Sequence, residues 1–184
     1  MARKLATEDI VERSELLDFV RPRHQWVLVT LRADGRPQTS PVTGGVSPAG
    51  KLVISTYPER DKTVNVGRDP RVSVCILSDH FGGAWVQVDG QAVITSAPEA
   101  VDEMVDYYRA VSGEHPDWDE FRQAMVRQGK CLITIDIERW GPIATGGFPP
   151  SLASIDALSE LLASDEEDDE GSDDETWHSD DDEE

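Results

Sequence analysis

The chain of 184 residues has little cysteine and no long apolar run. Its two cysteines, Cys75 and Cys131, stand alone in apolar segments, which indicates buried free thiols in a reducing compartment rather than disulfides or a structural metal site. No segment is apolar over membrane-spanning length, and the N-terminus lacks a charged-then-apolar signal. We therefore expect a cytoplasmic protein that does not bind a membrane.

Positive charge is also scarce, and the charge is unevenly distributed. The net charge is −20, from 37 acidic and 17 basic residues. Residues 151–184 hold 16 of the acids and none of the bases, which leaves 21 acids against 17 bases in residues 1–150. Neither part has the basic surface that a nucleic-acid-binding protein needs, so no nucleic-acid partner is expected.

This asymmetry predicts two parts, a folded domain over residues 1–142 and a Gly/Pro-rich linker with a disordered acidic tail over residues 143–184. A brief amphipathic helical segment is predicted at 155–162. The tail has two readings, a solubilising appendage or a docking segment for a basic partner, and Trp177 and His178 are the features that favour docking.

Alternating and β-branched segments predict about six strands joined by turns, with helices added. Asp34 and Gly35 mark a hairpin, and Pro37 and Pro41 indicate that the following strand is an edge, a bulge or an irregular stretch. We expect a mainly β domain with appended helices (α+β), built as a small antiparallel barrel. The expected strands are 26–31, 37–42, 52–56, 72–77, 85–95 (with a break at Gly90) and 131–137, and the expected helices are 8–20, 97–112 (with Pro98 in its first turn) and 117–129, with a short helical turn in 60–70.

The most informative segment is 60–70, a short helical turn between two strands. Its first residues include Arg60, Lys62 and Thr63. Free backbone N–H groups at a helix start, together with fixed positive charge, favour an anion such as a phosphate. The alternative is two solvated cations on a connecting helix, and residue chemistry alone leaves both open.

Four motifs follow one another along the chain: residues 34–38 at the first hairpin, Arg60-x-Lys62 with Asn65 and 69–74 around the helical turn, 85–92 in a strand, and 114–125. In this order they resemble the first hairpin, the phosphate-binding segment, the paired strand and a helical insertion of the split-barrel superfamily related to pyridoxamine 5'-phosphate oxidase. The resemblance covers residues 15–142. The last motif is the most specific, because it is similar to a helical insertion in the actinobacterial branch of reductases that depend on coenzyme F-420, a 5-deazaflavin.

The resemblance implies a split β-barrel of the FMN-binding-protein type that forms a homodimer and holds a phosphorylated, flavin-like cofactor. Ser55 and Thr56 would reach the phosphate or polyol, Gln38 and Ser40 would meet the ring, and the other subunit would supply Trp85 and Gln87. Without the resemblance, these residues read as surface strand positions, an edge strand and a core tryptophan. The implied cofactor-binding set is Gln38, Ser40, Ser55, Thr56, Arg60, Lys62, Thr63, Asn65, Trp85 and Gln87.

No catalytic side chain is expected, since His24, His80 and His115 have no suitably spaced partners and no nucleophile–base set is present. Hydride transfer fits this absence, because the cofactor carries the chemistry and the protein positions it. The preferred reading is a reductase that uses coenzyme F-420 to transfer hydride to a small organic acceptor. Residues 38–42 depart from the FMN-type oxidase pattern, yet an FMN-dependent oxidoreductase and a non-catalytic flavin- or haem-binding protein stay open as alternatives.

Overall fold

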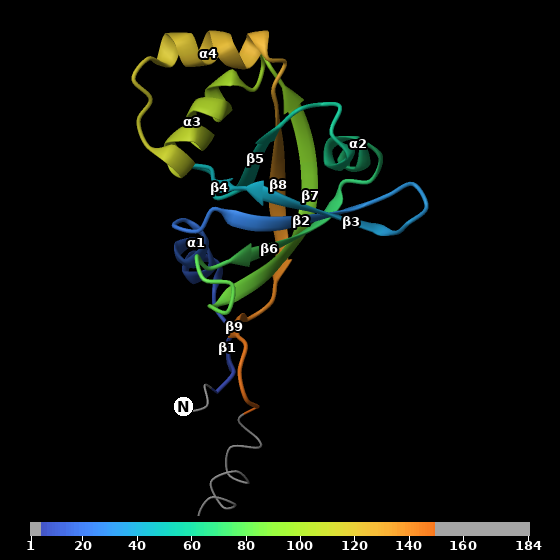
Figure 1. Ribbon diagram of the computed structural model, residues 1–184, viewed down its shortest axis with the longest axis vertical. Coiled ribbons are helices and arrows are strands. Elements are labelled where there is room, and N and C mark those ends of the chain that lie inside the picture. Colours follow the sequence, from blue (N-terminus) through green and yellow to red (C-terminus); the bar gives the residue numbers. More distant parts are fainter. Residues whose placement is uncertain (1–4, 150–184) are drawn as a thin grey trace, which may run out of the picture. The chain divides into compact units, whose positions relative to one another are not determined.

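The computed structural model describes residues 5–149, and Thr7–Gly146 form one compact unit (Figure 1). In this unit the chain forms nine strands and four helices. In chain order these are β1 (Thr7–Asp9), α1 (Arg13–Val20), β2 (Gln25–Leu31), β3 (Pro37–Thr43), β4 (Gly45–Val46), β5 (Leu52–Thr56), α2 (Asp61–Arg68), β6 (Arg71–Leu77), β7 (Trp85–Ser96), α3 (Val101–Ser112), α4 (Trp118–Arg127), β8 (Cys131–Trp140) and β9 (Ile143–Thr145).

The strands pair antiparallel in the order β3-β2-β6-β7-β8-β5-β4, and β9 joins β1 to the start of β7. The sheet curls into a half-barrel, so that β3 and β5, from opposite ends of this order, approach each other without pairing. The expectation of a mainly β, barrel-like domain with appended helices is confirmed. β3 pairs only with β2 among the described strands, as its two prolines require of an edge.

The core lies inside the curl. Trp26 and Leu28 on β2 point inward and are almost fully buried, and each large apolar side chain buried in this way contributes roughly 1.5–3 kcal/mol. Gly44 lies against the Trp26 ring, where a Cβ atom would come within 1.9 Å of it, so only glycine fits. α1 covers one end of the core with Leu16 and Val20.

A second apolar cluster holds α3 and α4 on the sheet. Met104 and Val105 from α3 and Phe121 from α4 pack on Val53 of β5 and Leu132 of β8. The two helices lie together at one end of the unit (Figure 1). The side chain of Asp117, the residue before α4, accepts a hydrogen bond from the amide of Glu120 and so caps this helix.

Two helix starts differ from the sequence expectation. Residues 7–9 pair with β9, so α1 begins only at Arg13, after a capping box made by Glu12 and Glu15. The amide of Ala97 still pairs with the carbonyl of Lys130, so α3 begins at Val101 and Pro98 lies ahead of its first turn. Long-range strand pairing overrides local helix signals in both places.

The sheet has three short strands that the sequence did not predict, β1, β4 and β9, and β9 occupies the first residues of the predicted linker. β8 also runs on to Trp140, past the predicted end at residue 137. β7 runs through Gly90 without the expected break, but its register with β8 shifts between Asp89 and Gly90. A Cβ atom at Gly90 would come within 2.1 Å of the Asp136 carbonyl oxygen, so the two backbones meet there. The predicted segment 155–162 and the acidic tail lie outside the described residues.

Candidate functional site

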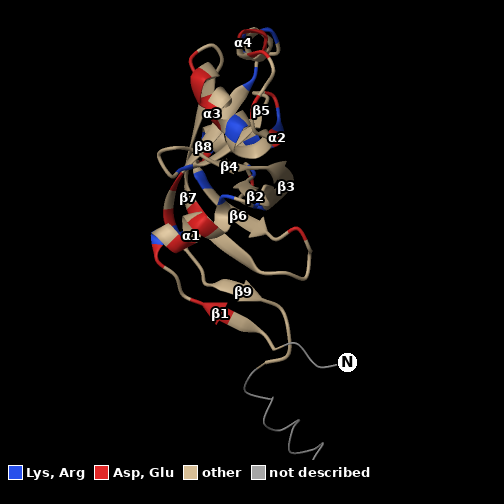
Figure 2. Ribbon diagram, turned by 90° about the vertical axis from the view of Figure 1, so that its left-hand side faces the viewer, with Lys and Arg blue, Asp and Glu red and all other residues tan. Residues whose placement is uncertain are grey.

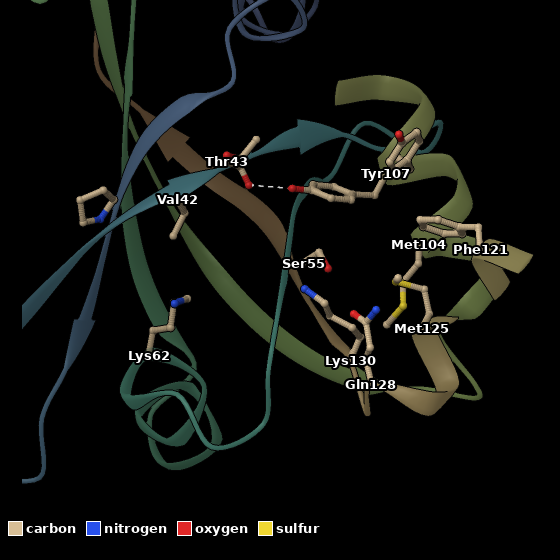
Figure 3. A pocket seen from close by; sticks show the side chains of 12 residues that line it. Val42, Thr43, Ser55, Lys62, Met104, Tyr107, Phe121, Met125, Gln128 and Lys130 are labelled. Atoms are coloured by element: carbon tan, nitrogen blue, oxygen red, sulfur yellow. Dashed lines mark hydrogen bonds between the residues drawn. The ribbon is translucent and has the colours of Figure 1, made fainter. Parts of the chain in front are cut away.

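A cleft of about 470 Å³ opens where β3 and β5 face each other without pairing (Figure 3). Its volume lies in the range of small-molecule and cofactor sites. Strands β3 and β5 and the helices α2, α3 and α4 all contribute to its lining. The lining residues are Pro41, Val42, Thr43, Ser55, Lys62, Met104, Tyr107, Tyr108, Phe121, Met125, Gln128 and Lys130.

Two lysines line the cleft, Lys62 from the wall made by α2 and Lys130 just before β8 (Figure 3). Neither forms an ion pair with another described residue. Burial, and then the nearby charge of Arg60, lower the pKa of Lys62 from its ordinary value. The Lys130 Nζ lies 4.1 Å from the centre of the Tyr57 ring, a cation–π contact that holds it. Two cations without an ion-pair partner among the described residues favour an anionic ligand here.

The start of α2 adds backbone donors to this wall. Arg60 is the N-cap residue, and its carbonyl accepts from the amides of Thr63 and Val64. The amides of Asp61 and Lys62 therefore lie ahead of the helix's own hydrogen bonds, as at any helix start. The Thr63 hydroxyl donates to the Tyr57 carbonyl at 2.9 Å, which ties α2 to the end of β5.

The inner face of α2 connects to β3 through a chain of polar side chains. Arg68 donates to Asn65, whose amide donates to the Thr30 hydroxyl, and this hydroxyl donates to Gln38. Gln38 in turn donates to the hydroxyl of Ser40 at 2.8 Å. Thr30 and Asn65 are buried, so these hydrogen bonds satisfy polar groups that water does not reach.

The opposite wall is apolar and comes from α3 and α4. Met104, Phe121 and Met125 face the cleft, while the acidic residues of α3 colour its outer side in Figure 2. The Tyr107 hydroxyl donates to the Thr43 carbonyl at 3.0 Å and fastens this wall to the edge strand (Figure 3). Burial raises the pKa of Tyr107, so its hydroxyl stays protonated.

The predicted site residues fall into four groups. Ser55 and Lys62 line the cleft, and Arg60 lies exposed beside it at the start of α2. Thr56, Thr63 and Asn65 are buried next to that wall. Gln38 and Ser40 lie on the inward face of β3, opposite Thr30 and Leu28 and in line with Val42 of the cleft.

Trp85 and Gln87 form the fourth group, and the chain does not bring them to this cleft. They line a different hollow of about 420 Å³, together with Trp140 and Arg139. Trp85 is 38% exposed, which rules out the alternative of a fully buried core tryptophan.

Sequence reasoning missed Lys130, Tyr107 and Met125. Lys130 reaches the cleft because β8 pairs with β5 at Thr56 and Cys131, a long-range register that the local sequence does not encode. The helical spacing of Met104 and Tyr108 indicated an apolar face for α3, but it could not separate core contact from cleft lining.

The described residues contain no cluster of three or more metal-ligating side chains, and none of their helices is long and apolar enough to cross a membrane. Both cysteines are free; Cys131 is buried and Cys75 is half-buried. Burial raises the pKa of each thiol, so neither is set up as a nucleophile.

Comparison with known proteins agrees with the fold. A conserved hypothetical protein from Mycobacterium tuberculosis is 26% identical, with a TM-score of 0.62, over 74% of this chain and 87% of that one. An F-420 reductase is 16% identical, with a TM-score of 0.52, over 71% of this chain and 98% of that one.

A haem-binding protein from Mycobacterium smegmatis is 20% identical, with a TM-score of 0.53, over 71% of this chain and 53% of that one. The last two likenesses establish a shared split-barrel fold. The family model described as pyridoxamine 5'-phosphate oxidase matches residues 13–144, most of the chain. The chain therefore belongs to the pyridoxamine 5'-phosphate oxidase family.

Proposed function

We propose that this protein is an oxidoreductase that depends on coenzyme F-420 and reduces a small organic acceptor. The observation that carries the proposal is the cleft itself, where Lys62 and Lys130, without ion-pair partners among the described residues, face an apolar wall across the open edge of a half-barrel. The family includes oxidoreductases with flavin-like cofactors, and a structural neighbour is an F-420 reductase.

The cationic wall suits the phosphate of such a cofactor. Lys62 and Arg60 stand at the start of α2, where backbone N–H groups add to their charge. Each charge-assisted hydrogen bond to the phosphate would contribute roughly 1.5–3 kcal/mol. Lys130 and the Ser55 hydroxyl lie along the same cleft and would bind the polyol or the acidic end of the molecule.

Thr56, Thr63 and Asn65 are buried and act behind this surface. Thr63 fixes the start of α2 to Tyr57, and Asn65 fixes its inner face to Thr30. These contacts hold Lys62 in position before any ligand arrives, which reduces the entropic cost of binding.

The ring of the cofactor would lie against β3, where Gln38, Ser40 and Val42 share the inward face. Met104, Phe121 and Met125 would exclude water from the opposite side. When bound, the reduced 5-deazaflavin supplies a hydride. This chain positions the cofactor ring and keeps water away from it. We assign no proton donor among the described side chains of the cleft.

We propose further that two copies of the chain complete the site. Trp85 and Gln87 lie away from their own chain's cleft, so they would reach a cofactor only in a second copy. The outer face of β2 and β6 carries the half-buried Val27, Val29 and Leu77, an apolar surface that suits a homodimer interface. Trp85→Glu should shift the protein from dimer toward monomer in light scattering. Val126→Glu, at an exposed position of α4, is the matched control and should leave the dimer intact. A dimer that is unchanged in Trp85→Glu would contradict this interface.

Two other functions fit parts of the site. FMN also carries a phosphate at the end of its ribityl chain and has a similar ring, and a haem-binding protein shares the fold. Turnover separates an enzyme from a carrier, because only an enzyme oxidises reduced F-420 in the presence of an acceptor. The test is a stopped-flow assay with 2-cyclohexen-1-one as the acceptor, in which the visible absorbance of oxidised F-420 should return. Binding of the cofactor with no turnover across a panel of enones, imines and quinones would favour the carrier.

A further inference from the structure

We propose that the hollow around Trp85 binds the acceptor for the cleft of a second copy, and that Arg139 in this hollow donates a hydrogen bond to the acceptor's carbonyl oxygen. The hollow has a volume of about 420 Å³ and is lined by one chain. The inference rests on the proposed function and on the proposed pairing of two copies. It adds the class of the acceptor, a neutral planar carbonyl compound, and the side chain that polarises it.

The Trp85 hollow lies far from the cleft of its own chain. Trp85 begins β7, and Ser96 ends it, where it pairs with Cys131, the neighbour of Lys130 in the cleft. A strand of twelve residues spans roughly 36 Å. Figure 1 accordingly shows α3 and α4 at one end of the unit and β9, which pairs with Trp85, toward the other. A ligand in this hollow therefore meets a cofactor only when that cofactor is bound to another copy.

Asp89 organises the polar side of the hollow. Its carboxylate accepts hydrogen bonds from the Ser73 hydroxyl, from the Gln87 amide at 3.0 Å and from Nε of Arg139 at 2.8 Å. Burial alone would raise the pKa of Asp89, but these three hydrogen bonds outweigh burial and lower the pKa, so the carboxylate stays charged. The guanidinium of Arg139 is therefore oriented before any ligand arrives, which reduces the entropic cost of binding.

The outer edge of the Arg139 guanidinium is free to bind a ligand. Only its Nε is used, and its two terminal nitrogens form no hydrogen bond with another described residue. The side chain is 81% exposed. Arg71 lies close by and lines an adjoining hollow together with Arg139, but it turns both Nε and a terminal nitrogen to Asp69. Arg139 thus offers donors to a ligand oxygen that Arg71 does not.

The other lining residues indicate the class of the ligand. The rings of Trp85 and Trp140 present apolar surface, which suits a flat conjugated molecule. Two acids, Glu8 and Asp89, line the hollow against the one base Arg139, so a ligand with a full negative charge is disfavoured. A neutral carbonyl compound avoids this repulsion, because only its oxygen, which faces Arg139, carries partial negative charge.

Reduction of a conjugated carbonyl compound develops charge at that oxygen. The hydride lost by the reduced 5-deazaflavin bonds to the β carbon of the acceptor. The electron pair of the C=C bond moves toward the carbonyl oxygen, and water then gives a proton to the α carbon. Arg139 donates to the oxygen as its negative charge grows, which lowers the barrier. This route needs no acidic side chain from the cleft.

The first experiment uses p-dimethylaminobenzylideneacetone, a neutral planar enone whose absorption band moves to longer wavelength when its oxygen accepts a hydrogen bond. It is titrated into the full-length protein without F-420, and the band and the tryptophan fluorescence are recorded. The wild type should shift the band and lose fluorescence. Arg139→Gln should abolish the shift and weaken binding by about tenfold. Arg71→Gln is the matched control and should retain both responses, and melting curves verify folding.

The second experiment tests the link to the other copy's cleft. Chains with Arg139→Gln are mixed with chains with Lys62→Ala/Lys130→Ala, and turnover of reduced F-420 with 2-cyclohexen-1-one is measured. A mixed dimer contains one intact cleft facing one intact hollow, so the mixture should regain about a quarter of the wild-type activity, well above either variant alone. If Arg139 served its own chain's cleft, no combination in the mixture would be intact.

Three results would overturn the inference. An unshifted band in the wild type, or a shift that persists in Arg139→Gln, would show that Arg139 does not bind the carbonyl oxygen. A mixture no more active than its two parents would show that the hollow does not serve a second cleft. If the wild type does not oxidise reduced F-420, the mixture is assayed with reduced FMN. Inactivity with both cofactors removes the acceptor role, whereas the enone titration still decides whether the hollow binds a carbonyl compound.

Discussion

The two walls of the cleft are built in opposite ways. The wall made by α2 holds its polar groups with hydrogen bonds between near neighbours in sequence, such as Thr63 to Tyr57 and Arg68 to Asn65. The wall made by α3 and α4 is held by apolar packing on Val53 and Leu132, which come from distant strands. Removing a side chain from the first should therefore cost ligand affinity, and removing one from the second should cost stability.

The largest effect is expected from the charged wall. Lys62→Ala should weaken F-420 binding by about ten- to a hundredfold, and the Lys62→Ala/Lys130→Ala pair by about a thousandfold, because charge-assisted contacts to the ligand are lost. Isothermal titration measures both. Lys51→Ala is the control, since that lysine pairs with Asp136 away from the cleft. If the double variant folds and still binds F-420 with wild-type affinity, the two lysines do not form an anion-binding site.

The apolar wall should respond in the opposite sense. Phe121→Ala should lower the free energy of unfolding by about 3 kcal/mol, because the ring is 7% exposed and leaves a cavity against Met104. Urea denaturation measures the loss. Val126→Ala, on the exposed side of the same helix, should cost much less than this. The contrast between the walls fails if Phe121→Ala costs more binding free energy for the ligand than it costs free energy of unfolding.

A pH series sharpens the comparison within the charged wall. The lowered pKa of Lys62 means that it loses its proton at a lower pH than an ordinary lysine, whose pKa is 10.5. Only the protonated form attracts a phosphate, so affinity should decline as the pH rises toward 10.5, and the decline should start earlier than for an unshifted lysine. Lys62→Arg keeps its charge and should flatten the profile. An equally steep decline in that variant would assign the titration to another group.

The smallest effect is expected from the C-terminal segment. Deleting residues 151–184 should leave the melting temperature and the F-420 affinity unchanged, since this segment has 16 acids, no base and few apolar residues with which to pack. Differential scanning fluorimetry at matched protein concentration measures the first quantity. A drop of many degrees would show that residues 151–184 pack on the folded domain and would contradict the predicted disordered tail.

The same contrast explains what the sequence could predict. The strand–helix–strand order around Lys62 is local, and the helix start, its cations and the flanking strands β5 and β6 were all predicted from it. Lys130 and Tyr107 were missed, because they reach the cleft only through the β5–β8 register and the packing of α3.

Asn65 shows the limit most clearly. Its three-residue spacing from Lys62 was visible in the sequence, and it was assigned to the site by resemblance. Its burial against Thr30 depends on how α2 sits on β2, which no local pattern determines. The early helix start predicted at residue 8 failed for the same reason, since pairing with β9 decides the conformation of residues 7–9.

The central claim is that this cleft selects a 5-deazaflavin. F-420 carries a chain of glutamates that a protein of net charge −20 repels at long range, but salt screens that field within roughly 8 Å, and the paired lysines act at contact. The most direct test is a parallel titration of the purified protein with F-420, FMN and hemin at one physiological salt concentration. We predict that F-420 binds most tightly and that its advantage over the other two is lost in Lys62→Ala/Lys130→Ala. Tighter binding of FMN, or a haem spectrum at stoichiometric hemin with no response to F-420, would contradict the account.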